Sequence, residues 1–258
     1  MSEPVAIRVE NLYKQFNKKQ DPVLRGVTYE FKAGHLTYIL GSSGAGKSVL
    51  LKHILGLLKP DQGEVYVGAQ AVSPLHGREL SHFRLAFGML FQNSALFDDF
   101  TVFENVAFPL WEHTKLTDPE IEEQVAHTLA ILGMKTGYDK LPNELSGGMR
   151  KRVGLARAII RHPSVLLYDE PTTGLDPVTR TTVDELIETL KTQLKLTSLV
   201  ISHDLPSALR LADEIAFLHQ GKIVFSGTAD EFRGSNHPAI KDFMNAETQA
   251  YEAFRGKS

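Results

Sequence analysis

The spacing of apolar residues at the start of the chain predicts β-strands. Val5, Ile7 and Val9 alternate with polar residues, which is the pattern of a strand with one buried face. A second strand is expected at 27–31, after a polar turn at 17–22. The chain is therefore expected to begin with two strands joined by a turn.

Apolar runs without alternation predict strands that are covered on both faces. Such strands are expected at 36–40, 86–91, 165–168 and 198–201. Two shorter runs, 215–218 and 222–225, flank Gln220-Gly221 and predict a hairpin.

Helices are predicted where apolar residues recur on one face and a capping residue precedes them. Asp118 and Pro119 look like the cap and the first residue of one helix, and Asp176-Pro177 begin another. The apolar faces comprise Ile121, Val125, Leu129 and Leu132 in the first helix, and Val183, Leu186, Ile187, Leu190 and Leu194 in the second.

Strands that alternate with helices indicate an α/β fold. We expect one domain, with core segments at about 1–97 and 146–235 and a mostly helical insert at about 98–145. The tail from about 236 to 258 is expected to be either helical or loose. It would brace a dimer or a small partner, or remain solvated.

The composition restricts the class of protein without defining its function. The chain has 258 residues, 42% of them hydrophobic and 23% charged, which is ordinary for a globular domain. A net charge of −3 gives no reason to expect binding to bulk nucleic acid. The absence of cysteine excludes disulfides and thiolate metal sites.

No sequence signal for membrane insertion is evident. Residues 1–4 lack a basic segment followed by an apolar one, so a signal peptide is not expected. No apolar run approaches the roughly 20 residues of a membrane span. Any role at a membrane is therefore expected to depend on a partner.

The strongest chemical signal is the segment that follows the strand at 36–40. It reads G-x-x-x-x-G-K-S from Gly41 to Ser48 and opens a helix that Gly56 closes. Glycines bring backbone N–H groups close to an anion, and the start of a helix adds its positive dipole end. Lys47 would reach the β- and γ-phosphates, and the Ser48 hydroxyl would bind Mg²⁺. This pattern predicts a nucleotide site.

Two acidic residues, Asp169 and Glu170, follow the strand at 165–168. An Asp there would hold Mg²⁺, and Glu170 would activate water as a general base. A solvated acidic pair is the alternative, but the neighbouring phosphate motif favours catalysis.

A second glycine-rich turn, Ser146-Gly147-Gly148, also opens a helix. It is either a second anion site or a simple serine cap, and the residues alone favour neither.

Three further residues stand at strand ends, and each has a plain structural alternative. His203 would contact a γ-phosphate or be a surface histidine, and Gln92 would orient water or bind Mg²⁺. Phe16 would stack on a base or be an ordinary hydrophobic residue at a strand end.

Together these segments resemble the ATP-binding cassette ATPases, the nucleotide-binding subunits of ABC transporters, over residues 5–235. Their motifs occur in the family's order. They are Phe16 at the adenine-stacking place, Gly41–Ser48 as Walker A, Gln92 as the Q-loop, residues 145–149 as the signature, 165–170 as Walker B, 174–176 as the D-loop and His203 as the switch histidine.

Some positions depart from the commonest pattern, including Met149 where Gln is usual, Tyr168, Thr173-Gly174 and Phe16. None of them removes a group expected to touch phosphate or Mg²⁺. With segments 91–97, 105–114 and 145–153, they resemble the Mla/Mce branch, whose ATPases drive phospholipid movement between the membranes of Gram-negative bacteria.

The resemblance implies a P-loop NTPase of the ABC ATPase type. Its RecA-like core would carry an N-terminal antiparallel β subdomain and a helical subdomain insert. ATP and Mg²⁺ are the implied cofactors. The implied catalytic residues are Glu170, His203, Gln92 and Lys47. The implied Mg²⁺ ligands are Ser48, Gln92 and Asp169. Nucleotide contacts would come from Phe16, Gly41, Ser42, Ser43, Gly44, Ala45, Gly46, Lys47, Ser48, Val49, Ser146, Gly147, Gly148 and Asp176.

The resemblance also implies a homodimer in which each ATP lies between one Walker A motif and the partner's signature. The dimer would serve an integral-membrane permease of the MlaE type, on the cytoplasmic face of the bacterial inner membrane. A periplasmic-side Mce-domain protein and a small cytoplasmic accessory protein are further implied partners, and nucleic acid is not. Phe97, Phe100, Phe103 and Phe108 would form a groove for a permease helix or pack as core.

Other functions remain as alternatives. An ABC ATPase for another solute would keep the same mechanism. A soluble ABC ATPase without a transporter, or a nucleotide-gated clamp with negligible turnover, would also carry a cassette. Glu170 and His203 disfavour the clamp, and the signature disfavours a small-molecule P-loop kinase.

Overall fold

A computed structural model describes residues 5–17 and 19–255 and divides the chain into two compact units. The first comprises Met1–Arg84 and Thr197–Ser258, and the second comprises Leu85–Leu196. The segment 1–4, Lys18 within the predicted turn and the last residues of the tail, 256–258, lie outside the described residues. The expected finer division at 97 and 145 stays a prediction.

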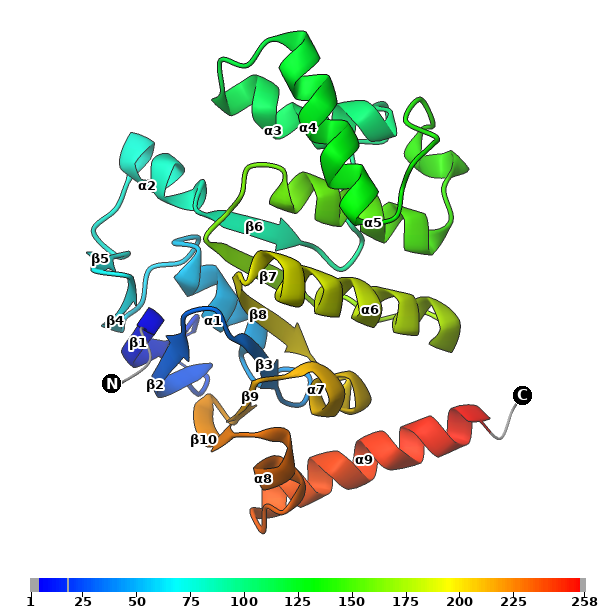
Figure 1. Cartoon of the computed structure of the whole chain (residues 1–258). Coiled ribbons are helices and arrows are strands. Elements are labelled where there is room, and N and C mark those ends of the chain that lie inside the picture. The colour runs from blue at the N-terminus through cyan, green and yellow to red at the C-terminus, as the bar shows by residue number, and fades with distance from the viewer. Residues whose placement is uncertain (1–4, 18, 256–258) are drawn as a thin grey trace. The chain divides into compact units, whose positions relative to one another are not determined.

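The first unit contains an antiparallel sheet of four strands in the order β2-β1-β4-β5 (Figure 1). Ile7 and Val9 of β1 are fully buried, as their alternation with polar residues predicts. The strands are β1 (Val5–Lys14), β2 (Leu24–Lys32), β4 (Gln62–Val67) and β5 (Gln70–Ala71).

The same unit contains parallel strands, of which β3 and β8 are buried along their whole length. β3 (Leu36–Leu40) pairs in parallel with β8 (Thr197–Ser202) on one side and with β9 (Glu214–His219) on the other. β10 (Lys222–Gly227) returns antiparallel to β9, which confirms the predicted hairpin. The apolar runs therefore identified these strands correctly, because both faces are covered.

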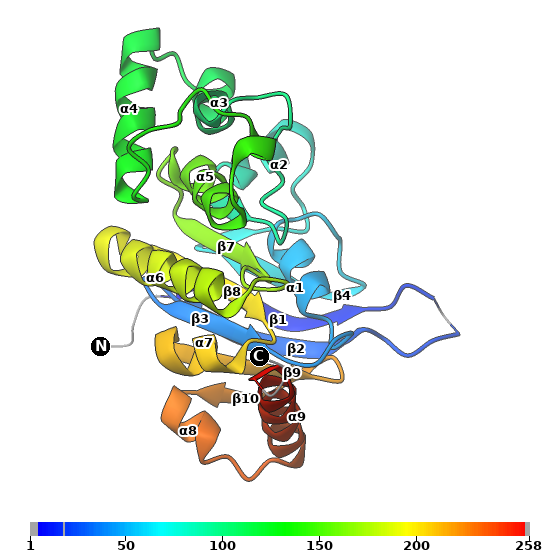
Figure 2. The ribbon, with the colours of Figure 1, turned by 90° about the vertical axis from the view of Figure 1, so that its right-hand side faces the viewer.

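The C-terminal tail, for which the sequence allowed either a helix or a loose segment, forms a helix in this unit. α9 (Pro238–Arg255) extends along residues expected to be helical or loose (Figure 2). Phe243 of α9 packs against Phe217 of β9, with ring centroids 5.2 Å apart. The other helices are α1 (Lys47–Ile54), α2 (Gly77–Arg84), α7 (Leu205–Leu211) and α8 (Ala229–Arg233).

The second unit pairs β6 (Phe87–Leu90) in parallel with β7 (Val165–Asp169) and carries four α-helices. They are α3 (Val102–His113), α4 (Asp118–Ile131), α5 (Gly147–Ile159) and α6 (Pro177–Leu194), with a 3₁₀ turn at Pro142–Glu144. In α4 the predicted apolar face, Ile121, Val125, Leu129 and Leu132, is buried.

The predicted start of α4 is wrong by one residue. The cap is Thr117, and Asp118 is already helical. The backbone N–H and the hydroxyl of Thr117 both donate to the Glu120 carboxylate at 2.7 Å, which fixes the turn one residue earlier. Together the two units confirm the expected α/β class. No helix in the described ranges is long and apolar enough to cross a membrane.

Candidate nucleotide-binding site

The glycine-rich segment links β3 to α1 and leaves the start of that helix open. Gly46 is the residue before α1, with φ of 108°, and no side chain caps the first turn. A Cβ at Gly46 would lie 2.9 Å from Leu24 Cδ2, so both the backbone angle and the space favour glycine. The N–H groups of the first turn are therefore available to an anion.

Lys47 is buried within this loop, whereas several of its neighbours are exposed. Its side chain is 8% exposed, and Nζ donates to the backbone oxygens of Gly41 at 2.6 Å and Ser42 at 3.3 Å. Ser42, Ser43, Gly44 and Ser48 lie at the surface. An ammonium held inside a loop of exposed backbone fits a bound phosphate, because charge and N–H donors face the same small space.

His203 follows the strand beside the one that precedes the loop. β3 and β8 are parallel and in register, with Leu40 opposite Ser202, so Gly41 and His203 leave the same edge of this sheet. His203 is exposed. The next residue, Asp204, caps α7 by accepting a hydrogen bond from Ser207 N at 3.2 Å. The structure thus brings these two predicted parts of the site together.

Phe16 lies two residues beyond the end of β1 and is 59% exposed. The Nζ atom of Lys14 lies 5.7 Å from the centroid of its ring. An exposed ring with a cation nearby is suited to stacking on a planar ligand.

In the second unit, Asp169 ends β7 and Glu170 follows it with φ of 49°. This left-handed conformation costs a residue other than glycine about 1–2 kcal/mol. Thr173 Oγ1 donates to Glu170 Oε2 at 2.9 Å. The turn therefore holds the Glu170 carboxylate in one place, and its left-handed backbone costs free energy. Residues held in such strained conformations often lie at functional sites.

The second glycine-rich turn begins α5, and its serine acts as the cap. Ser146 Oγ accepts from Met149 N at 3.3 Å. Ser146 is exposed, Gly147 and Gly148 are half-buried, and no acidic residue lies in the first turn. The serine cap, one of the two alternatives, is therefore present, and the helix start with no acidic residue remains suited to an anion.

Two more predicted residues lie in this unit. Asp176 caps α6, accepting from Val178 N at 3.0 Å and Thr179 N at 3.1 Å. Hydrogen bonds from the Thr179 hydroxyl and backbone lower the pKa of Asp176. Gln92 is exposed two residues beyond β6, and its backbone oxygen accepts from Lys151 Nζ.

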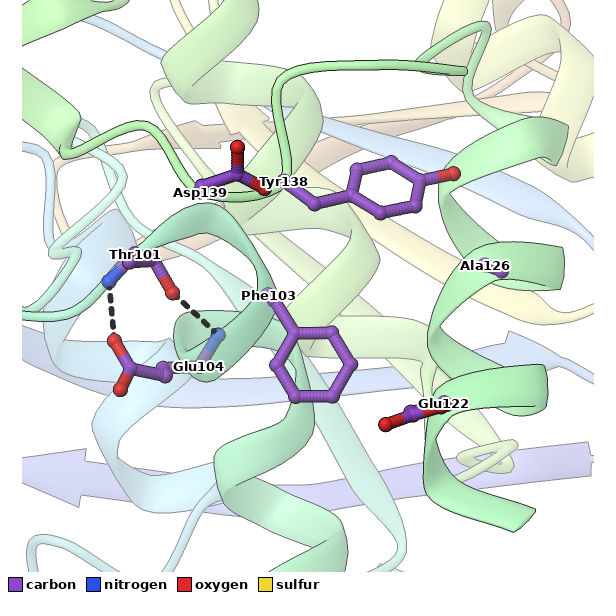
Figure 3. A pocket seen from close by; sticks show the side chains of 7 residues that line it. All are labelled: Thr101, Phe103, Glu104, Glu122, Ala126, Tyr138 and Asp139. Atoms are coloured by element: carbon purple, nitrogen blue, oxygen red, sulfur yellow. Dashed lines mark hydrogen bonds between the residues drawn. The ribbon is translucent and has the colours of Figure 1, made fainter. Parts of the chain in front are cut away.

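A cavity of about 520 Å³ lies elsewhere in the second unit, lined by parts of α3, α4 and the turn before the 3₁₀ helix (Figure 3). Thr101 N donates to Glu104 Oε2 at 2.7 Å on one wall. None of the residues predicted to bind nucleotide lines it. Its lining residues are Thr101, Phe103, Glu104, Glu122, Ala126, Tyr138 and Asp139.

A glycine loop that opens a helix after a buried parallel strand defines the chain as a P-loop nucleotide-binding protein. The family model for ABC transporters matches residues 24–173. The chain therefore belongs to the ABC transporter family, as an ATPase of the ATP-binding cassette type. This confirms the fold and the family expected from the motifs.

The relatives and solved structures agree with that assignment. The chain is 41% identical to the chloroplastic protein TRIGALACTOSYLDIACYLGLYCEROL 3 of Arabidopsis thaliana, over 93% of this chain and 73% of that protein. It is 38% identical to the intermembrane phospholipid transport system ATP-binding protein MlaF of Haemophilus influenzae, over 96% and 94% of the two chains.

A dimeric post-hydrolysis structure of an ATP-binding cassette, bound to ADP and Pi, is similar to this chain in fold. The TM-score is 0.76 at 29% identity, covering 86% of this chain and 98% of that one.

Proposed function

We propose that this chain is the ATP-hydrolysing subunit of a transporter that moves phospholipid between the inner and outer membranes and so maintains lipid asymmetry of the outer membrane. The observation that carries the proposal is the similarity to MlaF, a protein named for intermembrane phospholipid transport, along nearly the full length of both chains. No residue of this chain is assigned to the lipid itself.

ATP would bind through the open start of α1. The N–H groups from Gly41 to Val49 and the ammonium of Lys47 would hold the phosphates, with the side chains of Ser42, Ser43 and Ser48 at the surface of the loop. Phe16 would stack on the adenine, since its ring is exposed beside the cation of Lys14.

Mg²⁺ would supply charge neutralisation at the β- and γ-phosphates. Ser48, Gln92 and Asp169 would hold it with water and phosphate oxygens, as Mg²⁺ sites commonly combine few side chains with substrate oxygens. Among the described residues, no group of three or more His, Asp or Glu side chains could hold a metal ion.

Hydrolysis would begin when Glu170 accepts a proton from the attacking water. The left-handed turn and the hydrogen bond from Thr173, which hold its carboxylate, support this role. His203 would contact the γ-phosphate, Gln92 would orient the water, and Asp176 would connect the two sites of a dimer.

The active form would be a homodimer. A related cassette is dimeric with ADP and Pi bound, which supports the same arrangement here. The hydroxyl of Ser146 and the N–H groups of Gly147 and Gly148 would bind the γ-phosphate of the partner's ATP. Binding of ATP would then join the chains and hydrolysis would release them.

The membrane partner would meet the second unit. Residues 98–145 contain ten Asp and Glu residues against three Lys, a formal charge of −7, whereas the whole chain carries −3. Cytoplasmic loops of membrane proteins are rich in Lys and Arg, so the charges are complementary. Beside this region, Phe97 is 44% exposed, and its ring lies 5.0 Å from those of Phe100 and Phe108.

This surface supports docking to an MlaE-like permease from the cytoplasmic face of the bacterial inner membrane. A periplasmic-side Mce-domain protein and a small cytoplasmic accessory protein would complete the assembly. Nucleic acid is not among the proposed partners, since nothing in the net charge favours it.

The test is purification of the tagged chain from detergent-solubilised native membranes, with lipid analysis and ATPase assays of wild type and Glu170→Gln. We expect a permease, bound phospholipid, and an ATPase activity that Glu170→Gln abolishes. Phe97→Asp should lose the permease while retaining ATP binding. A permease carrying another solute would overturn only the lipid assignment, whereas activity without any membrane partner would overturn the transporter role.

A further inference from the structure

The segment from Phe91 to Thr101 contains no helix or strand, although Gln92 lies at its start. Ser94 and Ala95 have left-handed backbone conformations, with φ of 60° and 46°, although neither is a glycine. Ser94 is nevertheless only 3% exposed. An irregular, strained and partly buried backbone persists only when the surrounding structure holds it.

One face of α5 supplies that support through three positions spaced three residues apart. Lys151 Nζ donates to the backbone oxygens of Gln92 and, at 3.5 Å, of Phe91. Arg157 Nη2 donates to the oxygens of Ser94 at 2.9 Å and Ala95 at 2.8 Å. Between them, Gly154 lets the segment approach closely, since a Cβ there would lie 3.2 Å from Ser94 Cβ.

Asn105 of α3 holds the other end of the segment. Its Oδ1 accepts from Phe97 N at 2.9 Å, and its Nδ2 donates to the oxygens of Phe97, Phe100 and Thr101 at 3.0–3.1 Å. The Arg157 guanidinium also lies 5.5 Å from the centroid of the Phe97 ring. The segment is thus fixed from Gln92 to the exposed aromatic residues.

Removing the charges of Lys151 and Arg157 from water costs free energy, which their hydrogen bonds to this segment must offset. Lys151 is 4% exposed, and within 5–17 and 19–255 neither cation lies within ion-pair distance of a carboxylate. Burial lowers the pKa of Lys151 to about 8 and also lowers the pKa of Arg157. Buried cations without a carboxylate are rare, because their desolvation is compensated only by the groups they bind.

We propose that Lys151 is a positioning residue for ATP hydrolysis, which places Gln92 by holding its backbone, while Arg157 fixes the adjoining turn. α5 begins directly after Ser146, so the helix that presents the signature also sets the position of Gln92. The inference rests on the proposed roles of Gln92 and Ser146. It assigns to α5 the task of holding both groups in fixed positions from one helix.

The test compares Lys151→Met with Arg152→Met in the full-length chain, purified with whatever membrane partner accompanies it. Arg152 is the matched control, since it lies next on α5 but donates to the backbone oxygen of Leu132 at the end of α4. Lys151→Met should lower kcat about tenfold with KM for ATP nearly unchanged, because misplacement of a catalytic group costs turnover more than binding. Backbone amides of 92–97 should exchange hydrogen faster, whereas in Arg152→Met neither kcat nor this exchange should change.

A second variant distinguishes positioning from general damage. Lys151→Arg keeps the donor and should restore part of kcat, and thermal melting should show both Lys151 variants folded. Normal kcat in Lys151→Met, or an equal loss in Arg152→Met, would overturn the inference. Full activity in Gln92→Ala would contradict the proposed role of Gln92, and the inference would fall with it. If Gln92→Ala is inactive and Lys151→Met is active, only the inference is contradicted.

Discussion

The two glycine-rich turns of this chain begin helices in opposite ways. At α1 the residue before the helix is Gly46, no side chain caps the first turn, and Lys47 is buried inside the loop. At α5 the residue before the helix is Ser146, whose hydroxyl caps Met149 N; Ser146 is exposed, and Gly147 and Gly148 are half-buried. Similar sequence patterns thus produce an open loop with a buried lysine in one place and a serine-capped turn in the other.

The difference bears on the proposal that one chain offers two complementary halves of a phosphate site. The α1 loop supplies donors and a positive charge around one small space, as a tightly bound phosphate requires. At the α5 turn the Ser146 hydroxyl already accepts from Met149 N, and we propose that this turn completes a site that begins on another chain. Substitutions at the two turns should therefore have different consequences.

The largest effect is expected from Lys47→Ala. Removing the ammonium leaves the oxygens of Gly41 and Ser42 without this donor and the phosphates without their cation, so ATP affinity should fall by about 100-fold or more. Equilibrium binding of a fluorescent ATP analogue measures this. Wild-type affinity would contradict the role of the α1 loop.

Ser146→Ala should act on the second turn and leave the first intact. We expect unchanged ATP affinity and about a tenfold loss of ATP-dependent dimerisation, measured by light scattering, because one hydroxyl contact to the γ-phosphate is removed. Loss of the cap should also cost about 1 kcal/mol of stability.

The control for this cap is Thr101→Ala, which removes the hydroxyl that caps α3 through Glu104 N. It should cost similar stability without affecting dimerisation. Equal loss of dimerisation in both variants would show that cap loss, rather than a ligand contact, is responsible.

Phe16→Ala should affect only ATP binding at the α1 loop. The ring is 59% exposed, so its removal should leave the melting temperature unchanged. Loss of base stacking should weaken ATP binding by up to about tenfold. Affinity for inorganic pyrophosphate, which has no base, should stay the same, and a parallel fall would refute stacking.

The smallest expected effects are changes in the free energy of unfolding, and these should differ between the two turns. Gly46→Ala must adopt φ of 108° and approach Leu24, so it should lower the free energy of unfolding by about 1–2 kcal/mol. A Cβ at Gly148 would come no closer than 3.7 Å to Thr179, so Gly148→Ala should change stability by less than about 0.5 kcal/mol. Urea unfolding of the two variants measures this difference, and equal losses would contradict it.

Much of this arrangement follows from the sequence. The buried strands, the β9–β10 hairpin and the Asp176 cap are local patterns, so the residues themselves predict them. The cradle at Lys47 was predicted for the same reason, because its glycines and its lysine lie within eight residues of one another.

Other features depend on contacts between distant residues and left no local signal. The segment 91–101 lacks periodicity, and its support comes from Lys151 and Arg157, about 60 residues further along the chain. In the sequence Lys151 is one of three consecutive basic residues and looks like part of a solvated helix face. The predicted start of α4 was wrong because Asp118 and Thr117 are both good caps, and the Glu120 carboxylate favours Thr117. 

The ATPase activity of a mixed dimer tests most directly whether each α5 turn acts on the partner's ATP. Lys47→Ala and Ser146→Arg, carrying different tags, would be co-expressed and the mixed species isolated by tandem purification. If each α5 turn acts on the partner's ATP, this dimer retains one intact site and should show roughly half of wild-type activity, while each variant alone is inactive. A mixed dimer as inactive as its parents would contradict the claim that the two turns complete each other's site across the dimer.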